Sequence, residues 1–260
     1  MKVGLIGAGN MARAMARGWG DPVLASDSGS GRAQALVDEL GGRAASNVEV
    51  AQEADLVVLC HKPYQLTQVA REIAPYVKAV ASVVGGTQAA DLLKAYSGKP
   101  LFRLMPNTPV EVRRGVILYS PLEGPGFGWP LEIDRDLEAA VLELFGRLGW
   151  VATVPGELAA VAAALTSVAP AYMALVVEAQ TEAGLRHGLR ADLAARLAVE
   201  TMGGSAALLA ARDGDTLRVR REVTSPGGST SRGLDALERG GLRAAFAAAI
   251  DRVLSDGQAG

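Results

Sequence analysis

The chain has 260 residues and a formal net charge of -2, so its length allows one large domain or two of ordinary size. Hydrophobic residues make up 49% and charged residues 21%, and the 31 glycines and 12 prolines follow no period, which excludes collagen-like, coiled-coil and disordered chains. The near-neutral charge and the 5% of aromatic residues do not provide the basic, aromatic-bearing surface of a nucleic-acid binder, so we expect no nucleic-acid partner.

Short apolar runs in the first part of the chain alternate with helix-like stretches. We expect strands at 2–6, 23–26, 56–60, 79–84, 101–105, 116–119 and 151–154. This alternation is typical of βαβ units and predicts a mostly parallel sheet. Helices on both faces of such a sheet explain why the runs are apolar throughout. The stretch 120–130, rich in glycine and proline, is predicted to be a surface loop.

A glycine loop follows the first predicted strand and opens a helix. Gly7 permits a tight turn, Gly9 lets backbone amides approach a pyrophosphate, and Ala12 is small enough for the helix to pack closely. A strand before the loop and a helix after it are the context that a dinucleotide site requires. We therefore predict a cofactor site that includes Gly7, Gly9, Asn10 and Met11, the alternative being that the glycines only form a turn.

The second predicted strand ends at Ser26 and Asp27, near the place where an acid usually receives the ribose hydroxyls of a dinucleotide. Such an acid favours NAD, because it repels the 2'-phosphate of NADP. The polar residues Ser28, Ser30 and Arg32 around it can instead bind a phosphate. We assign Ser26 and Asp27 to the cofactor site, with Asp27 as a simple turn residue as the alternative. The choice between NADP and NAD stays open.

After residue 155 the chain is rich in Ala and Leu and shows almost no strand pattern. We expect helices at 157–168, 171–187, 191–211, 216–222, 230–239 and 242–255. The predicted fold class is α/β, with an N-terminal Rossmann-type dinucleotide-binding domain at 1–155 and an all-α dimerisation and substrate domain at 156–260. The low polarity of this second domain predicts that part of its surface meets another subunit.

The uncharged run at 158–177 is long enough to cross a bilayer. Its many alanines and Pro170 in mid-span favour a helix of a soluble protein with a break, so we expect no membrane partner. The single cysteine, Cys60, cannot form an intramolecular disulfide and fits a reducing cytoplasm. Because the chain reaches Gly4 too early for the core of a signal peptide, we expect no export signal and a cytoplasmic location. We assign no metal site.

Three further strings add chemistry: Cys-His-Lys-Pro at 60–63, Arg-Leu-Met-Pro-Asn-Thr-Pro at 103–109, and Ser-Pro-Gly-Gly-Ser-Thr at 225–230. Together with the glycine loop, their order and spacing make nearly the whole chain resemble pyrroline-5-carboxylate reductase, the last enzyme of proline biosynthesis. The resemblance implies an NAD(P)H-dependent reduction of 1-pyrroline-5-carboxylate by a homodimer. It also implies that the substrate is held between the nucleotide domain of one subunit and the helices of its partner.

The first two of these strings leave the carboxyl ends of predicted strands, where ligands bind in open α/β sheets. The resemblance implies that Lys62 and Pro63 lie along the nicotinamide side of the cofactor. It also implies that Met105, Pro106 and Asn107 line the cleft at the reactive end of the cofactor. The alternatives are a solvated loop lysine and a rigid crossover between strands.

The third string is predicted to be a turn that opens a helix. Gly227 and Gly228 expose backbone amides, and Ser225, Ser229 and Thr230 add hydroxyls. An anion is favoured at a helix N-terminus, so these five residues are predicted to hold the carboxylate of the substrate. The alternative is an N-cap with no ligand. The resemblance implies that the hydroxyl of Thr230 contacts the imine nitrogen, and we assign Thr230 as the catalytic residue.

Reduction of a cyclic imine needs a hydride donor, a pocket that fixes the ring, and a proton on nitrogen. An imine nitrogen is more basic than a carbonyl oxygen and can arrive protonated, so a strong protein acid is dispensable. This suits a chain in which we interpret His61 and His187 as structural. Alignment of the reacting atoms would then supply most of the rate enhancement.

One segment departs from the pattern of the family. Ala160 and Ala163 stand where the family typically has Asp and Thr, and Thr-Ser-Val-Ala at 166–169 replaces Ser-Gly-Ser-Gly. The loss of these polar groups leaves the substrate open. A related imine or 2-keto-acid reductase and a non-catalytic nucleotide-binding relative are the alternative functions.

Overall fold

A computed structural model describes residues 1–122 and 134–256. The chain forms two compact units, one that ends at Val168 and one that begins at Ala169. We expected the domain boundary after residue 155. Helix α7 (Ala159–Thr166) lies between the two positions and packs against strand β7 (Gly115–Ser120) of the first unit. Most of the loop predicted at 120–130 lies outside the described residues.

The first unit is built on one eight-stranded sheet with the order β3-β2-β1-β4-β5-β6-β7-β8. Besides β7, its strands are β1 (Val3–Ile6), β2 (Val23–Ser26), β3 (Gly42–Ala44), β4 (Leu56–Leu59), β5 (Val80–Ser82), β6 (Leu101–Pro106) and β8 (Gly149–Thr153). All neighbouring strands pair in parallel except β6 and β7. The mostly parallel sheet that the sequence predicts is therefore confirmed.

The antiparallel pair has a simple cause in the length of its connection. Strands β6 and β7 are joined through the 3-10 helix η2 (Thr108–Val112), whereas a parallel crossover needs a dozen or more residues. The chain therefore turns back directly, and Arg103 pairs with Ser120. Both strands stay in the same sheet, and the stiff segment after Pro106 lies at the carboxyl end of β6.

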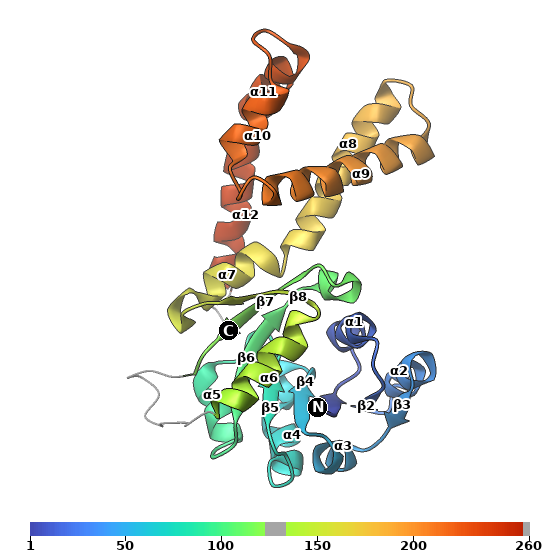
Figure 1. Cartoon of the computed structure of the whole chain (residues 1–260), viewed down its shortest axis with the longest axis vertical. Coiled ribbons are helices and arrows are strands. Elements are labelled where there is room, and N and C mark those ends of the chain that lie inside the picture. Colours follow the sequence, from blue (N-terminus) through green and yellow to red (C-terminus); the bar gives the residue numbers. More distant parts are fainter. Residues whose placement is uncertain (123–133, 257–260) are drawn as a thin grey trace. The chain divides into compact units, whose positions relative to one another are not determined.

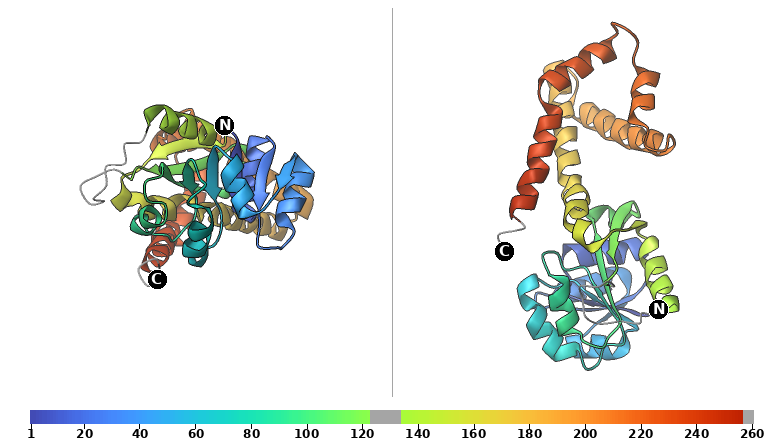
Figure 2. Two further views of the ribbon diagram at one scale, coloured as in Figure 1. Left: turned by 90° about the horizontal axis from the view of Figure 1, so that it is seen from below. Right: turned by 90° about the vertical axis from the view of Figure 1, so that its left-hand side faces the viewer.

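Helices cover both faces of the sheet (Figures 1 and 2). One core contains side chains of α1 (Asn10–Trp19), α2 (Arg32–Leu40) and α6 (Arg135–Gly146). The other contains side chains of α3 (Asn47–Glu53), α4 (Leu66–Ile73) and α5 (Ala89–Ala95). Adjacent residues of a strand enter opposite cores, as Leu5 and Ile6 do, which is why the runs are apolar at every position.

Strand β3 is missing from the sequence prediction. It has only three residues, pairs at the sheet edge with β2, and places Gly42 opposite Val23. Gly42 has a positive φ of 107°, and a Cβ there would lie 2.0 Å from the carbonyl oxygen of Val23. The strand is thus set by its contact with a neighbour and not by an apolar pattern of its own.

The second unit contains helices only in its described part. They are α8 (Ala169–Arg186), α9 (Ala191–Ala210), α10 (Thr216–Val223), α11 (Ser229–Arg239) and α12 (Leu242–Asp256). Helices α8 and α9 pack along each other, and the rings of Tyr172 and Phe246 meet edge to face with centroids 6.4 Å apart. The all-helical prediction for this region is confirmed, and the predicted break near Pro170 falls between α7 and α8.

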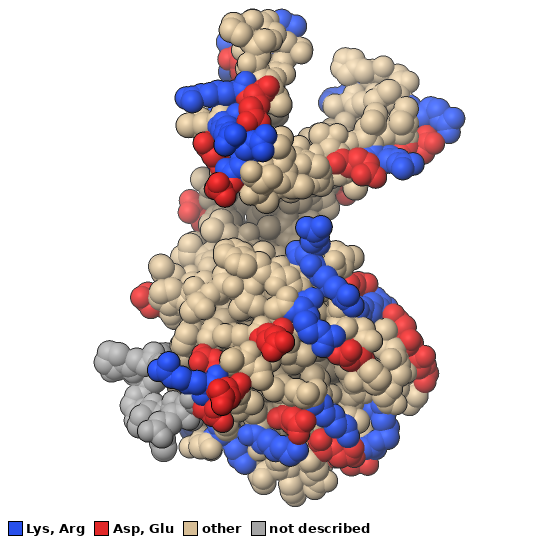
Figure 3. Space-filling model, viewed as in Figure 1, with Lys and Arg blue, Asp and Glu red and all other residues tan. Residues whose placement is uncertain are grey.

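The second unit has almost no core of its own. Among its described residues, the buried hydrophobic side chains are Ala194 and Ala198, while Leu175, Val199 and Leu237 are each more than half exposed. Broad areas of this unit carry no charge in Figure 3. The helical stretches Gly156–Arg186, which begins in the first unit, and Ala191–Ala210 are long and apolar enough to cross a membrane by length and composition alone. A surface that a second protein chain covers has the same composition.

Candidate active site

The glycine loop lies between β1 and α1, as the sequence predicts. Gly7 has a φ of 99°, and a Cβ there would lie 2.9 Å from the backbone of Cys60 and His61. This residue must therefore be glycine for β1 and β4 to stay paired. At Gly9 the backbone is extended, and a Cβ would meet no atom within 4 Å. Gly7 thus serves the fold, whereas Gly9 keeps space clear in front of the loop.

Helix α1 begins directly behind this space. Its N-cap is Gly9, and no side chain caps its first turn. The amides of that turn therefore face outward with the positive end of the helix dipole, as an anion-binding site requires. The side chain of Asn10 accepts a hydrogen bond from Arg13 at 2.8 Å, which leaves the approach to the amides open. Met11 is partly buried against the core of the first unit.

Asp27 organises the loop that follows β2. One carboxylate oxygen accepts from the amides of Gly29 (2.7 Å) and Ser30 (3.1 Å), and the other accepts from the Ser30 hydroxyl (3.1 Å) and the Ala33 amide (2.8 Å). Partial burial disfavours its charge, but the hydrogen bonds from Ala33, Gly29 and Ser30 outweigh this and lower the pKa of Asp27 below 3.8. Its carboxylate is therefore engaged by the loop itself.

Ser26 belongs to a polar chain that the sequence analysis missed. Its buried hydroxyl donates to Oδ1 of Asn47 at 2.6 Å, and Nδ2 of Asn47 donates to Glu72 at 2.9 Å. Ser26 thus supports Asn47, which lines the cavity described below. Asn47 opens helix α3 directly after the N-cap Ser46, within the capping box of Ser46 and Glu49. That capping box is the signal in the sequence that could have placed Asn47 at this edge of the sheet.

Strand β4 ends at a third side of the open space in front of Gly9 and the start of α1. Lys62 is exposed and precedes the 3-10 helix η1 (Pro63–Gln65), and its amide donates to Gln65 at 2.9 Å. Nδ1 of His61 lies 2.8 Å from the carbonyl oxygen of Lys62, so the proton must sit on Nδ1. Nε2 of His61 is buried and has no partner among the described residues. Burial lowers the pKa of this imidazole below 6.5.

These three strand ends enclose a cavity of about 350 Å³ in the first unit. Of the predicted cofactor residues, Gly7, Gly9, Asp27 and Lys62 line it. The residues that the prediction did not assign to the site, and that also line the cavity, include Ser28, Ser30, Arg32, Asn47, His61, Tyr64, Gln65, Gln68 and Glu72. Asn10, Met11, Ser26, Pro63 and Asn107 are not part of its lining. The space, the uncapped helix and two cationic side chains together fit the phosphates of a dinucleotide.

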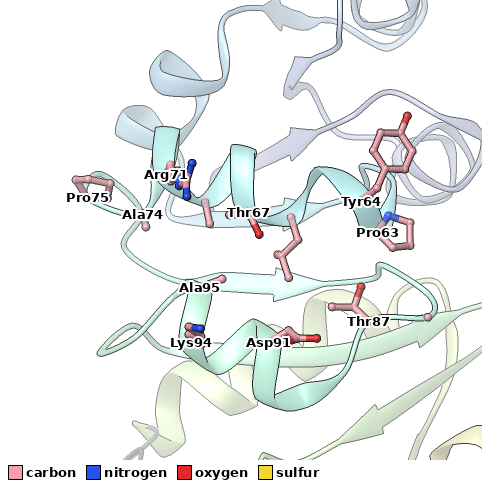
Figure 4. Close-up of a pocket in the computed structure, with 13 residues that line it drawn as sticks. Pro63, Tyr64, Thr67, Arg71, Ala74, Pro75, Thr87, Asp91, Lys94 and Ala95 are labelled. Atoms are coloured by element: carbon pink, nitrogen blue, oxygen red, sulfur yellow. The ribbon is translucent and has the colours of Figure 1, made fainter. Parts of the chain in front are cut away.

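A larger groove of about 820 Å³ lies between α4 and α5 (Figure 4). Pro63 and Tyr64 stand at one end of it, and Tyr64 also lines the smaller cavity. The charged side chains along it, Arg71, Asp91 and Lys94, are exposed to solvent. We place the chemistry at the smaller cavity, because the glycine loop and the carboxyl ends of the strands meet there.

Asn107 is buried at the end of β6, and both ends of its amide are engaged. Oδ1 accepts from the amide of Val116 at 2.8 Å, and Nδ2 donates to the carbonyl oxygen of Thr166 at 3.1 Å. It therefore links β6, β7 and the C-terminal end of α7. These two hydrogen bonds already engage both ends of the side-chain amide. The contact of Asn107 with a cofactor, which the resemblance implies, stays a prediction. The hydroxyl of Thr166 itself bonds back to Ala162 at 3.0 Å.

The loop from Ser225 to Thr230 precedes α11 in the second unit. Gly227 has a φ of 68°, and a Cβ at Gly228 would lie 2.4 Å from Oγ of Ser225, so the two glycines permit this turn. The N-cap is Gly228, and no side chain caps the helix. The described residues supply no hydrogen bond to the hydroxyls of Ser225, Ser229 and Thr230. No side chain of this loop therefore acts as the N-cap of α11, which was the alternative to a ligand site.

The segment that departs from the family pattern is helical up to Thr166. Ala160 is exposed and Ala163 is partly buried, and as alanines neither supplies a polar side chain. Ser167 is exposed beyond the end of α7. No cluster of three or more metal-binding side chains occurs in residues 1–122 and 134–256. Burial raises the pKa of the Cys60 thiol, which therefore stays neutral next to the glycine loop.

Comparison with known proteins finds matches over both units. Residues 157–259 match the family described as pyrroline-5-carboxylate reductase dimerisation, and residues 2–86 match NADP oxidoreductase, coenzyme F420-dependent. The pyrroline-5-carboxylate reductase of Treponema pallidum is 32% identical and covers 98% of this chain and 99% of its own. The enzyme of the same name from Glycine max is 31% identical over 95% of this chain and 92% of its own.

Solved structures agree over the whole chain. A pyrroline-5-carboxylate reductase from Coxiella burnetii has a TM-score of 0.85 at 27% identity and covers 99% of this chain and 97% of its own. The pyrroline carboxylate reductase of Plasmodium falciparum, solved with NADP bound, also has a TM-score of 0.85, at 24% identity over 100% of this chain and 97% of its own. The second likeness concerns the fold alone.

Proposed function

The chain belongs to the pyrroline-5-carboxylate reductase family, and we propose that it reduces 1-pyrroline-5-carboxylate to L-proline with NAD(P)H, the last step of proline biosynthesis. The observation that carries this proposal is the loop at 225–230, an uncapped helix N-terminus beside unengaged hydroxyls. The dinucleotide cavity of the first unit supports the same reaction.

NAD(P)H bound in that cavity would supply the hydride. The amides of the first turn of α1 would hold its pyrophosphate, with Gly9 leaving room for close approach. Lys62, exposed at the end of β4, would add a positive charge beside it. The buried hydroxyl of Ser26 and the exposed carboxylate of Glu72 would hold Asn47 at the wall of the cavity.

Within the pair of possible cofactors we propose that NADPH is preferred. The carboxylate of Asp27 is engaged by four hydrogen bonds from its own loop, so its oxygens are not free to bind two ribose hydroxyls. The exposed side chains of Ser28 and Arg32 line the cavity next to it. A guanidinium and a hydroxyl are suited to a 2'-phosphate.

The residues of the second unit would act on the substrate. The amides of the first turn of α11 and the hydroxyls of Ser225 and Ser229 would bind its carboxylate. The hydroxyl of Thr230 would accept a hydrogen bond from the protonated imine nitrogen and so orient the ring. No protein acid is required for this step, because the imine can arrive protonated. Positioning and hydrogen bonding therefore carry the rate enhancement.

We also propose a cytoplasmic homodimer formed through the second unit. The support is the small core of that unit, its exposed Leu175, Val199 and Leu237, and the dimerisation family that matches it. A second copy would cover this surface in place of lipid. The unpaired thiol of Cys60 fits a reducing compartment. Sedimentation in dilute buffer should give a dimer or a larger assembly, and a compact monomer at micromolar concentration would contradict the proposal.

A related imine or 2-keto-acid reductase is the second candidate. The observation that favours it is the absence of polar side chains at Ala160 and Ala163. Oxidation of NADPH and NADH should therefore be followed with 1-pyrroline-5-carboxylate, with a six-membered cyclic imine carboxylate and with an open-chain 2-keto acid. The highest kcat/KM is expected for 1-pyrroline-5-carboxylate with NADPH. Turnover of another substrate alone would select the second candidate, and nucleotide binding without any turnover would select a non-catalytic role.

A further inference from the structure

Arg232 reaches back from helix α11 to the loop that precedes it. Its guanidinium Nη1 donates to the carbonyl oxygen of Gly227 at 2.7 Å. This reach follows from helix geometry, because a side chain in the first turns leans toward the N-terminus of its helix. Gly227 is the residue of this loop with the positive φ, so the bond fixes the carbonyl of one of the two glycines on which the turn depends.

The charge of Arg232 is not neutralised by a neighbour. The other arginines of α11 and α12 that form ion pairs show the contrast: Arg239 pairs with Asp235 at 3.1 Å and Arg243 with Glu238 at 2.9 Å. Among the described residues no carboxylate lies within ion-pair distance of Arg232, and its hydrogen-bond partner is an uncharged carbonyl. Its positive charge thus adds to the dipole of α11 at the same loop.

We infer that Arg232 is a positioning residue for the carboxylate of the substrate. It holds the Gly227 carbonyl so that the amides after Gly228 keep their direction, and it places a positive charge next to the anion that they bind. This inference rests on the proposed function. It assigns to Arg232 a selectivity for cyclic imines that carry a carboxylate over the same ring without one.

The test compares 1-pyrroline-5-carboxylate with 1-pyrroline, which lacks the carboxylate, in the full-length enzyme with NADPH. Arg232→Leu should raise KM for 1-pyrroline-5-carboxylate about tenfold, the equivalent of about 1.4 kcal/mol, with little change in kcat. KM for NADPH and the kinetics with 1-pyrroline should not change. Arg232→Lys, which keeps the charge, should recover most of the loss. Added salt should raise KM in the wild type more than in Arg232→Leu.

Arg239→Leu is the matched control, since it removes an arginine from the same helix that is already paired with Asp235. An unchanged KM in Arg232→Leu, an equal change in Arg239→Leu, or an equal loss with both substrates would overturn the inference. A wild-type enzyme that turns over neither substrate would instead overturn the proposed function. In that case, calorimetry with L-proline still tests Arg232: weaker binding only in Arg232→Leu supports its role, and equal binding refutes it.

Discussion

The side-chain amide of Asn107 donates to the carbonyl oxygen of Thr166, 59 residues later in the chain, at 3.1 Å. This bond attaches the C-terminal end of α7 to the edge of the sheet, while the Oδ1 of the same amide accepts from Val116. One buried residue therefore fixes three segments of the first unit. Its role is explained by these partners before any ligand is considered.

We expect Asn107→Ala to lower the free energy of unfolding by about 1–3 kcal/mol, because it leaves partly buried backbone groups of Val116 and Thr166 without this partner. Urea unfolding followed by circular dichroism measures this. Asn10→Ala, which removes an exposed amide bonded to Arg13, is the control and should change stability by less than about 0.5 kcal/mol. An Asn107→Ala protein of normal stability that binds NADPH weakly would show that the amide serves the cofactor instead.

Substitutions of the two glycines in the first loop should have different effects, one on cofactor binding and the other on stability. Gly9→Val should abolish NADPH binding in a folded protein, because the side chain enters space that is open in the fold but needed by the pyrophosphate. Gly7→Ala should lower the thermal midpoint, because its φ of 99° and its contact with the Cys60 backbone leave no room for a Cβ. Calorimetry and thermal unfolding on both variants separate these effects. Full NADPH affinity in Gly9→Val would refute the assignment of the loop.

Cofactor preference should depend on Arg32. Arg32→Ala should weaken binding of NADPH about tenfold or more and leave NADH unaffected, because only NADPH carries the 2'-phosphate. Titration of both nucleotides by fluorescence measures the ratio. Arg13→Ala, in the preceding helix α1 and outside the cavity lining, should leave the ratio unchanged. Equal losses of affinity for NADPH and NADH would show that Arg32 does not recognise the 2'-phosphate.

Protonation of His61 should lower the stability of the protein as the pH falls. Burial lowers its folded pKa below the unfolded value of 6.5, so the unfolded chain binds a proton first and protonation favours unfolding. The free energy of unfolding should therefore be constant above pH 6.5 with respect to this group and decline below it. His61→Gln should remove that part of the decline, whereas His187→Gln, at an exposed position, should retain it. Identical pH profiles for the wild type and His61→Gln would contradict this assignment.

Strands β1, β2, β4 and β5 were predictable because they are buried on both sides and so carry their own apolar pattern. Strand β3 was not, since Gly42, Arg43 and Ala44 have no such pattern and form a strand only by pairing with β2. The order of the sheet likewise requires the packed structure, apart from the short connection that makes β6 and β7 antiparallel.

The site shows the same division. Gly7 and Gly9 are recognisable because their backbone role is local to the loop. The engagement of Asp27 by the amides of Gly29 and Ser30 corresponds to the alternative of a turn residue. The engagement of Asn107 by Val116 and Thr166 depends on hydrogen-bond partners that no spacing rule identifies. Asn47 was missed for a related reason: its function comes from Ser26, which precedes it by 21 residues.

The hydroxyl of Thr230 lies in the first turn of α11 and has no hydrogen-bond partner in the part of the chain that the structure describes. Thr230→Ala should lower kcat with 1-pyrroline-5-carboxylate about ten- to a hundredfold, because losing a hydrogen bond to a charge-changing nitrogen costs roughly 1.5–3 kcal/mol. Thr230→Ser should retain most of the turnover, since the role requires the hydroxyl and not the methyl group. Ser229→Ala is the matched control and should raise KM more than it lowers kcat, because we place Ser229 on the carboxylate. If Thr230→Ala changes KM alone, Thr230 binds only the ground state of the substrate, and if it changes neither constant, Thr230 has no part in the reaction.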